Sequence, residues 1–214
     1  MQALADTLAW LRANPGAFTG AVGEHLMLSL VGLFLGIGVA VPLGLAVAHR
    51  PRLGELAISL AGGLRTLPSL AVLAALLPLL GVGFTPSVIA LALLAIPPVL
   101  VNLLAGLRGA DPAAVAAAAG LGMSPRQVLF RVEVPLALPL LFAGLRISAV
   151  QVVSAAALAT FIGGGGLGDL VTQGLALLDT GRMVLGALTI SALALLTEAG
   201  FGLLERRLQR RVQA

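Results

Sequence analysis

Residues 111–139 read DPAAVAAAAGLGMSPRQVLFRVEVPLALP, and they form the one sizeable polar interruption in the middle of a chain of long apolar runs. Pro112 and Pro125 can each open a helix, because proline is tolerated in the first helical turn. The segment therefore predicts short helices that meet water or a soluble partner, with apolar segments on both sides.

The apolar runs set the fold class. The chain has 214 residues, of which 59% are hydrophobic and 10% are charged, and its mean hydropathy is +1.07. A soluble domain carries about 25% charged residues. We therefore predict an all-α polytopic membrane protein, with one membrane domain over residues 20–214 and an amphipathic interfacial segment over residues 1–19.

Five apolar stretches are long enough to cross a hydrocarbon core, which takes about 20 residues. They run over residues 26–48, 56–80, 86–107, 135–162 and 183–204. Before them, Leu4, Leu8 and Leu11 share one helical face, which favours a helix lying in the membrane interface and ending at Pro15 and Gly16.

Proline and glycine interrupt these stretches. Prolines occur within the spans at positions 42, 68, 78, 97, 98 and 139. They either kink a static bundle or belong to a bundle that bends, and several of them around one polar loop favour a moving transporter. The run Gly163 to Gly166 is either a flexible connector or a loop near an external gate.

Arginine is distributed unevenly between the connecting segments. With five spans and a cytoplasmic C-terminus, the outer segments hold only Arg12 and Arg182. The cytoplasmic segments then hold Arg50, Arg52, Arg108, Arg126, Arg131, Arg206, Arg207, Arg210 and Arg211. Since positive residues favour the cytoplasmic side, we predict an external N-terminus, a cytoplasmic C-terminus and a cytoplasmic loop over residues 108–134.

Several classes of protein are excluded by what the sequence lacks. There is no lysine, and a P-loop needs one to reach the nucleotide phosphates, so any ATP must be hydrolysed by a partner. There is no cysteine for thiolate chemistry. We interpret the isolated His25 and His49 as interfacial side chains rather than metal ligands. We therefore predict no enzyme activity, catalytic site, metal site or bound cofactor.

The polar loop carries a specific spacing. Ala116-Ala117-Ala118 is followed, after three residues, by Gly122. Nine further residues lead to Val132-Glu133-Val134-Pro135, in which two apolar residues flank Glu133 and proline comes last. This spacing resembles the cytoplasmic coupling loop of permease subunits of binding-protein-dependent ABC importers. In that family the first of the three positions is glutamate, whereas here it is Ala116.

Further stretches are similar to one group of these importers. They are RTLPSL at 65–70, GVGF at 81–84, GLRGADP at 106–112, GLGMSP at 120–125 and IGGGGLGD at 162–169. The group imports quaternary-amine osmoprotectants such as glycine betaine, choline or carnitine. A methionine-type or other amino-acid ABC importer is the alternative. An ion-coupled secondary transporter fits less well, because the first four spans contain no carboxylate.

The resemblance implies a set of partners and roles. Residues Ala116, Ala117, Ala118, Gly122 and Pro135 would form and delimit a coupling helix that docks on a separate cytoplasmic ATPase, which binds ATP and Mg²⁺. An external substrate-binding protein and a second permease, identical or similar, complete the expected complex. The expected location is the cytoplasmic membrane of a bacterium or archaeon, in contact with lipid and without nucleic acid.

Two arginines lie inside predicted spans. Arg65 and Arg146 are each roughly 15 Å from the cytoplasmic start of their span at the rise of an α-helix. An intramembrane charge is costly and therefore a functional candidate. Either both line the translocation path, where a positive potential suits a zwitterion or a carboxylate, or they pair structurally near the cytoplasmic face with Glu133 or Glu55.

Uncharged polar groups within the spans are the other path candidates. Asn102, Ser148, Gln151 and Ser154 could face the path or could join helices by hydrogen bonds. Gln151 is the preferred path residue. For Glu198 in the fifth span, we favour a charge at the end of the span or facing a partner over a proton carrier.

Overall fold

The computed structural model describes the backbone of residues 2–212 and the side chains of residues 5–205. All elements of that backbone are helical, which confirms the predicted class. In chain order they are α1 (Gln2–Ala13), α2 (Pro15–Val47), α3 (Pro51–Thr66), α4 (Ser69–Leu80), α5 (Phe84–Arg108), α6 (Pro112–Gly120), α7 (Pro125–Val128), the π-helix η1 (Leu129–Glu133), α8 (Val134–Ala155), the 3-10 helix η2 (Ala156–Ile162), α9 (Leu167–Leu177) and α10 (Thr180–Val212). The side chains of Leu4, Arg206, Arg207, Arg210 and Arg211, used in the predictions above, lie outside the described residues.

Four stretches of the described helices are long and apolar enough to cross a membrane. They are Pro15–Val47, Phe84–Arg108, Pro125–Ile162 and Thr180–Glu205. A fifth candidate is the pair α3 and α4, whose axes are bent by 96°. The first, third, fourth and fifth predicted spans therefore correspond to helices, and α2 begins at Pro15, well before the predicted start at Leu26.

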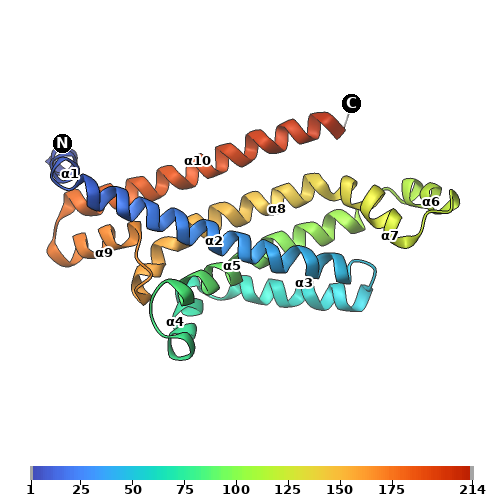
Figure 1. Ribbon diagram of the computed structural model, residues 1–214, viewed down its shortest axis with the longest axis horizontal. Coiled ribbons are helices and arrows are strands. Elements are labelled where there is room, and N and C mark those ends of the chain that lie inside the picture. Colours follow the sequence, from blue (N-terminus) through green and yellow to red (C-terminus); the bar gives the residue numbers. More distant parts are fainter. Residues whose placement is uncertain (1, 213–214) are drawn as a thin grey trace.

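The second predicted span, residues 56–80, was wrong as a continuous helix. The break falls at Leu67 and Pro68, where Leu67 has φ −73° and ψ 130°. Proline disfavours the helical conformation of the residue before it and donates no backbone hydrogen bond itself. The chain therefore leaves the α3 axis at this point, and α4 turns away from the bundle (Figure 1).

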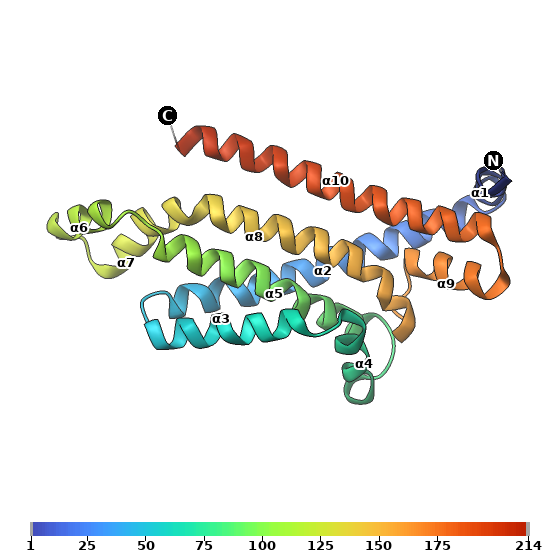
Figure 2. The same cartoon turned by 180° about the vertical axis from the view of Figure 1, so that it is seen from behind.

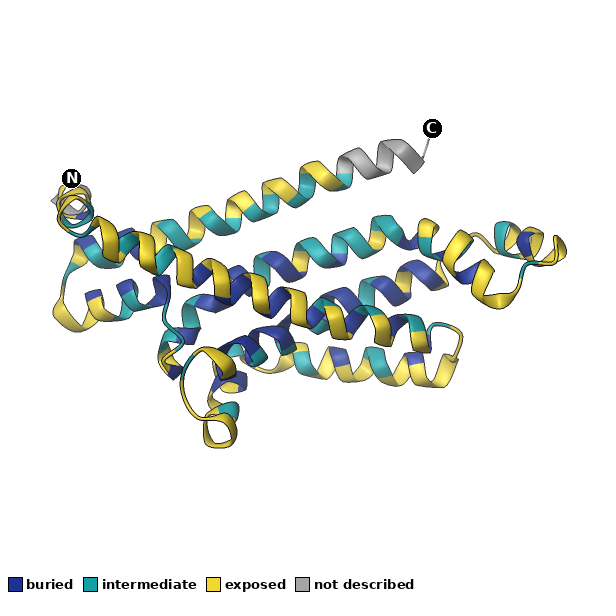
Figure 3. Ribbon diagram, viewed as in Figure 1, coloured by how far each residue is buried: buried dark blue, intermediate teal, exposed yellow. Residues whose placement is uncertain are grey.

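Helix α5 forms the centre of the bundle, packed between α2 and α8 (Figure 2). Of the apolar window of α5, 67% is buried, against 11% for α10. Leu91, Ala95, Val99 and Leu104 of α5 are buried in the core, whereas exposed and half-buried residues alternate along most of the described part of α10 (Figure 3). The four spanning helices therefore differ in how much of their apolar window is buried, and α10 has the least buried window.

Glycines bring the backbones of the central helices into direct contact. A Cβ atom on Gly36 of α2 would lie 2.5 Å from the Ala95 Cβ and 2.8 Å from the Ala92 carbonyl oxygen of α5. On the other side, a Cβ on Gly144 of α8 would lie 2.7 Å from the Pro98 carbonyl oxygen. Small residues at such crossings allow the close packing that associates helices in a membrane.

Helix α1 is docked on the protein as well as amphipathic. It ends at Ala13, next to the predicted stop at Pro15. The Thr7 hydroxyl donates a hydrogen bond of 3.1 Å to the Gly181 carbonyl at the start of α10. The Arg182 guanidinium lies 5.3 Å from the centre of the Trp10 ring, within cation–π range.

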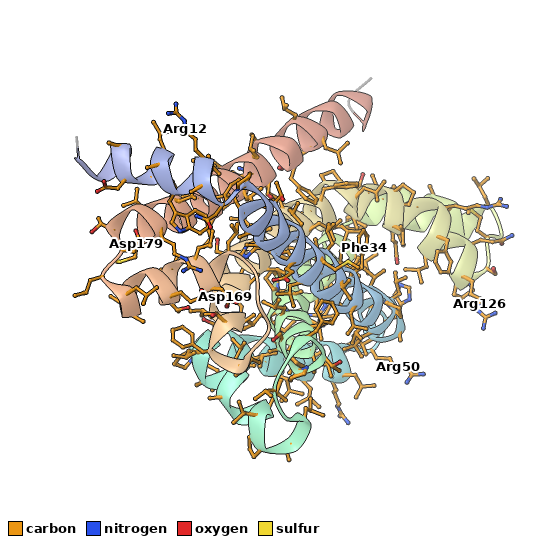
Figure 4. The ribbon with its side chains drawn as sticks, turned by 60° about the vertical axis from the view of Figure 1, so that its left-hand side comes forward. Arg12, Phe34, Arg50, Arg126, Asp169 and Asp179 are labelled. Atoms are coloured by element: carbon orange, nitrogen blue, oxygen red, sulfur yellow. The ribbon has the colours of Figure 1, made fainter. Side chains whose placement is uncertain are left out.

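The two ends of the bundle carry different elements. Helices α1 and α9 lie at one end, and α6, α7 and the last turns of α10 lie at the other (Figures 1 and 2). Figure 4 shows Arg12 and Asp179 at the first end and Arg50 and Arg126 at the second. Helix α9 was not foreseen, because residues 167–177 are a short segment that the sequence analysis left without an element.

Gly36→Ala tests the α2–α5 contact. We expect it to destabilise the purified protein by about 1–3 kcal/mol, because the added methyl group meets backbone atoms that cannot move aside. The readout is the thermal unfolding midpoint in detergent. The matched control is Gly38→Ala in the same helix, where a Cβ has no neighbour within 4 Å. Equal midpoints for the two variants would contradict the proposed contact.

Candidate coupling and transport sites

The predicted coupling segment consists of two capped helices. Asp111 caps α6, because its Oδ1 accepts a hydrogen bond of 2.9 Å from the Ala113 backbone N–H. Ser124 and Gln127 form a reciprocal capping box at the start of α7. Pro112 and Pro125 occupy the first turns, as predicted. Local sequence thus fixes both helices without help from distant residues.

A tight turn at Gly122 separates the two helices. Gly122 has φ +78°, a conformation that costs other L-residues roughly 1–2 kcal/mol. Three consecutive backbone N–H groups, from Leu121 to Met123, donate to carbonyls in the last turns of α6 at 3.0–3.2 Å. The chain therefore reverses within a few residues, and Gly122 lies just after the end of α6.

The predicted coupling residues do not all face the same way. Ala116 and Ala117 are exposed, Ala118 is buried towards the bundle, and Gly122 and Pro135 are exposed. Leu121, which the prediction did not include, is 84% exposed at the tip. The segment extends past the ends of the neighbouring helices (Figure 3). It presents a small, mostly apolar surface outward and anchors itself through Ala118.

A hydrogen-bonded pair of side chains joins the coupling segment to the turn between α2 and α3. His49 Nε2 lies 2.8 and 3.1 Å from the two carboxylate oxygens of Glu133. Glu133 ends η1, which leads from α7 into α8, and its side chain is 10% exposed. A cavity of about 280 Å³ beside the pair is also lined by Arg108 and Val115. The expectation that Glu133 pairs with Arg65 or Arg146 was wrong, because the α2–α3 turn brings His49 closer.

Two of the predicted path residues serve packing within the chain. The Ser148 hydroxyl is fully buried and donates a hydrogen bond of 3.0 Å to the Ala95 carbonyl of α5. The Asn102 amide donates to the Pro98 carbonyl of its own helix at 2.8 Å. In this arrangement Ser148 joins helices, the second of the two roles considered for it, and Asn102 is half-buried against Gly144.

Arg146 pairs with α10. Its Nε donates to Glu198 Oε1 at 2.8 Å, Nη2 contacts the same oxygen, and Nη1 donates to Glu205 Oε2 at 3.1 Å. Arg146 therefore forms an ion pair within the chain, which was the alternative to lining the path. Its partners lie on α10, however, and are not Glu133 or Glu55. Glu198 was predicted to be a charge at the end of the span or facing a partner, and its pairing with Arg146 was not foreseen, because the two residues are 52 positions apart. Arg65 lies exposed in the last turn of α3, next to the bend.

Gln151 and Ser154 remain on the surface of the chain. Gln151 is half-buried on α8, and Ser154, one turn later, is exposed. Neither side chain makes a hydrogen bond to any of the described residues. These two of the predicted path residues therefore stay available to water or to another molecule.

The four-glycine run is tied to its surroundings on both sides. The Gly166 backbone N–H donates to Glu24 Oε2 at 3.0 Å, and the Gly83 N–H donates to the Ile162 carbonyl at 2.7 Å. His25, predicted to be interfacial, has no exposed surface, lies under Gly166 and contacts the Val153 carbonyl through Nε2 at 3.0 Å. Absence of a side chain at Gly166 permits this burial, which composition alone could not reveal.

Several known proteins are similar to this chain in sequence, and solved structures are similar to it in fold. Residues 32–210 match the family described as the inner membrane component of binding-protein-dependent transport systems. The carnitine transport permease protein OpuCB of Listeria monocytogenes is 42% identical over 185 residues, covering 86% of this chain and 85% of that protein. The glycine betaine/carnitine/choline transport system permease protein OpuCB of Bacillus subtilis (strain 168) is 38% identical over 200 residues, covering 94% and 92%.

A solved structure carries the same architecture. An inward-facing form of the MetNI methionine ABC transporter superposes with a TM-score of 0.78 over 94% of this chain and 97% of that chain, at 21% identity. This likeness establishes the fold as that of ABC importer permeases. Together with the sequence match over most of the chain, it means that the protein belongs to the family of inner membrane components of binding-protein-dependent transport systems.

Proposed function

We propose that this chain is the membrane subunit of an ATP-driven importer for a quaternary-amine or zwitterionic solute such as glycine betaine, carnitine or choline. The observation that carries the proposal is the 38–42% identity, over most of both chains, to permeases whose names give these solutes. The methionine alternative has weaker support, because the likeness to a methionine transporter at 21% identity concerns the fold alone.

The coupling segment is the proposed docking site of a separate ATPase. Its exposed residues Ala116, Ala117 and Leu121 form a narrow apolar tip that a cleft in a partner could enclose. The absence of lysine supports a separate ATPase, because the chain cannot form a P-loop itself. ATP and Mg²⁺ would be bound there, while an external binding protein delivers the solute and a second permease completes the path.

The proposed orientation puts the coupling segment in the cytoplasm and the N-terminus outside. The described arginines Arg50, Arg52, Arg108, Arg126 and Arg131 all belong to the elements at the end that bears α6 and α7. Arg12 and Arg182 belong to elements at the opposite end. The positive-inside rule favours the first end as cytoplasmic, in the inner membrane.

Uptake measurements test the substrate and the energy source together. Vesicles that contain the permease with its ATPase and binding protein should accumulate radiolabelled glycine betaine, carnitine or choline only when ATP is inside. Ionophores that dissipate ion gradients should leave this uptake unchanged. Accumulation of methionine in place of these solutes, or uptake driven by an ion gradient without ATP, would contradict the proposal.

Gly122→Val tests the coupling role. A β-branched residue at φ +78° is strained by roughly 1–2 kcal/mol, although a Cβ there has no neighbour within 4 Å. We expect uptake and solute-stimulated ATP hydrolysis to fall together, while the protein still inserts in the membrane. Gly120→Val is the matched control, since Gly120 is equally open but helical. If both variants transported normally, residues 112–128 would not be the coupling segment.

Ala116→Glu restores the glutamate that the family pattern carries at this position. The Ala116 side chain is exposed, so the longer side chain fits without repacking. An added charge-assisted contact of roughly 1–2 kcal/mol should hold the ATPase more tightly. The measurement is the salt concentration that dissociates the purified complex, which should rise. A lower value would mean that the partner surface is shaped for alanine.

A further inference from the structure

The cluster of Arg146, Glu198 and Glu205 lies within the length of the spanning helices. Arg146 is twelve residues from Val134, the start of α8, which is about 18 Å along the axis. Glu198 is eighteen residues from Thr180, the start of α10, or about 27 Å. Helices α8 and α10 lie side by side in both views (Figures 1 and 2). Arg146 therefore lies well inside its span, whereas Glu198 is about 10 Å before Glu205, the last residue of the apolar span of α10.

The cluster is built into the contact between the two helices but is not enclosed by it. Gly202, one turn after Glu198, lies beside the guanidinium, since a Cβ there would be in ordinary van der Waals contact with Arg146 Cζ at 3.9 Å. The Arg146 and Glu198 side chains nevertheless remain 36% and 40% exposed. One side of the ion pair thus faces away from this chain.

A neighbouring stripe of α8, about a quarter turn around the helix from Arg146, is also exposed or half-buried. Ile147, Gln151 and Ser154 are spaced at i, i+4 and i+7, which places them in one stripe on the helix. Ile147 follows Arg146 directly and is exposed, as is Ser154. Gln151 and Ser154 have no hydrogen-bond partner among the described side chains and backbone. The face therefore combines an ion pair with an amide and a hydroxyl that need a partner.

Lipid is a poor environment for this face. A charged side chain at the centre of a bilayer costs at least roughly 2.5–3.5 kcal/mol. An amide or hydroxyl without a hydrogen bond adds about 1–3 kcal/mol on the scale of protein mutations. By contrast, the exposed face of α2 carries Phe34 and Leu43, which suit lipid, whereas α3 ends near the exposed Arg65. The α8–α10 face is mixed, because the exposed Leu195 and Leu196 lie on it together with the ion pair, the amide and the hydroxyl.

We infer that the α8–α10 face, defined by Arg146, Gln151, Ser154 and Glu198, lines the water-filled path of the assembled transporter. This inference rests on the proposed function and adds to it the wall along which the solute moves. It also changes the expected electrostatics of that wall. Arg146 does not give the path a positive potential by itself, because Glu198 and Glu205 both bind its guanidinium. The wall offers both signs of charge side by side, as a zwitterion does.

The accessibility of introduced cysteines tests the inference, and the permease itself contributes no other thiol to the labelling because it contains no cysteine. The probe is Leu195→Cys, one turn before Glu198 on α10, and the matched control is Phe34→Cys on α2. The two positions are 69% and 67% exposed in the single chain, so burial within the chain does not distinguish them. Ser154→Cys provides a second, nearly isosteric probe on α8.

Each variant is assembled with its ATPase, reconstituted in vesicles and treated with a charged methanethiosulfonate reagent that does not cross membranes. We expect Leu195→Cys and Ser154→Cys to react at least about tenfold faster than Phe34→Cys, because only an ionised, hydrated thiol attacks the reagent. Trapping the ATPase with ATP and vanadate should change the rates of the two probes but not that of the control, since the path alternates its access.

The inference fails if both probes react as slowly as Phe34→Cys, or if their rates are the same with and without nucleotide trapping. Solute uptake by the same vesicles distinguishes a failure of the path assignment from a failure of the proposed substrate. Normal uptake with unreactive probes would overturn the path assignment alone. Reactive probes that respond to nucleotide, in vesicles that take up none of the proposed solutes, would overturn the substrate proposal alone.

Discussion

Direct backbone contact between α5 and its two neighbours is the constraint on which the rest of the structure depends. Helices gain little by burying apolar surface against one another in lipid, so close packing and hydrogen bonds must hold them. Gly36 and Gly144 remove the side chains at the two contacts, and the Ser148 hydroxyl adds a bond to Ala95. The three central helices therefore form one closely packed unit, whereas only 11% of the apolar window of α10 is buried.

In the proposed coupling role, that unit would let a short loop at one end act on the whole bundle. The coupling segment hangs between α5 and α8, and near this end Gly106 of α5 again packs directly on Ala137 of α8. His49 adds a third attachment through Glu133. A push on α6 would therefore reach both α5 and α8 at once, and through α8 the ion pair with α10.

Local features were predictable from the sequence, whereas partners across the bundle were not. Pro112, Pro125 and Gly122 fixed the coupling segment, because caps and turns depend on residues a few positions apart. The continuous second span failed at Pro68, where the local rule was available but was outweighed by the length of the apolar run. Burial of His25 escaped prediction, since apolar residues surround each span on all sides and leave no periodicity that marks the inward face.

The pairing of Arg146 with Glu198 has a consequence for how the transporter responds to membrane voltage. Moving one elementary charge across the membrane changes the energy by about 2.3 kcal/mol per 100 mV. The guanidinium and the Glu198 carboxylate carry opposite charges that are in contact, and Glu205 adds a second carboxylate, so the three groups sum to one negative charge. If α8 and α10 shift together as the path opens, the Arg146–Glu198 pair itself does almost no electrical work. The voltage dependence that these residues add then comes from Glu205, at the end of the span.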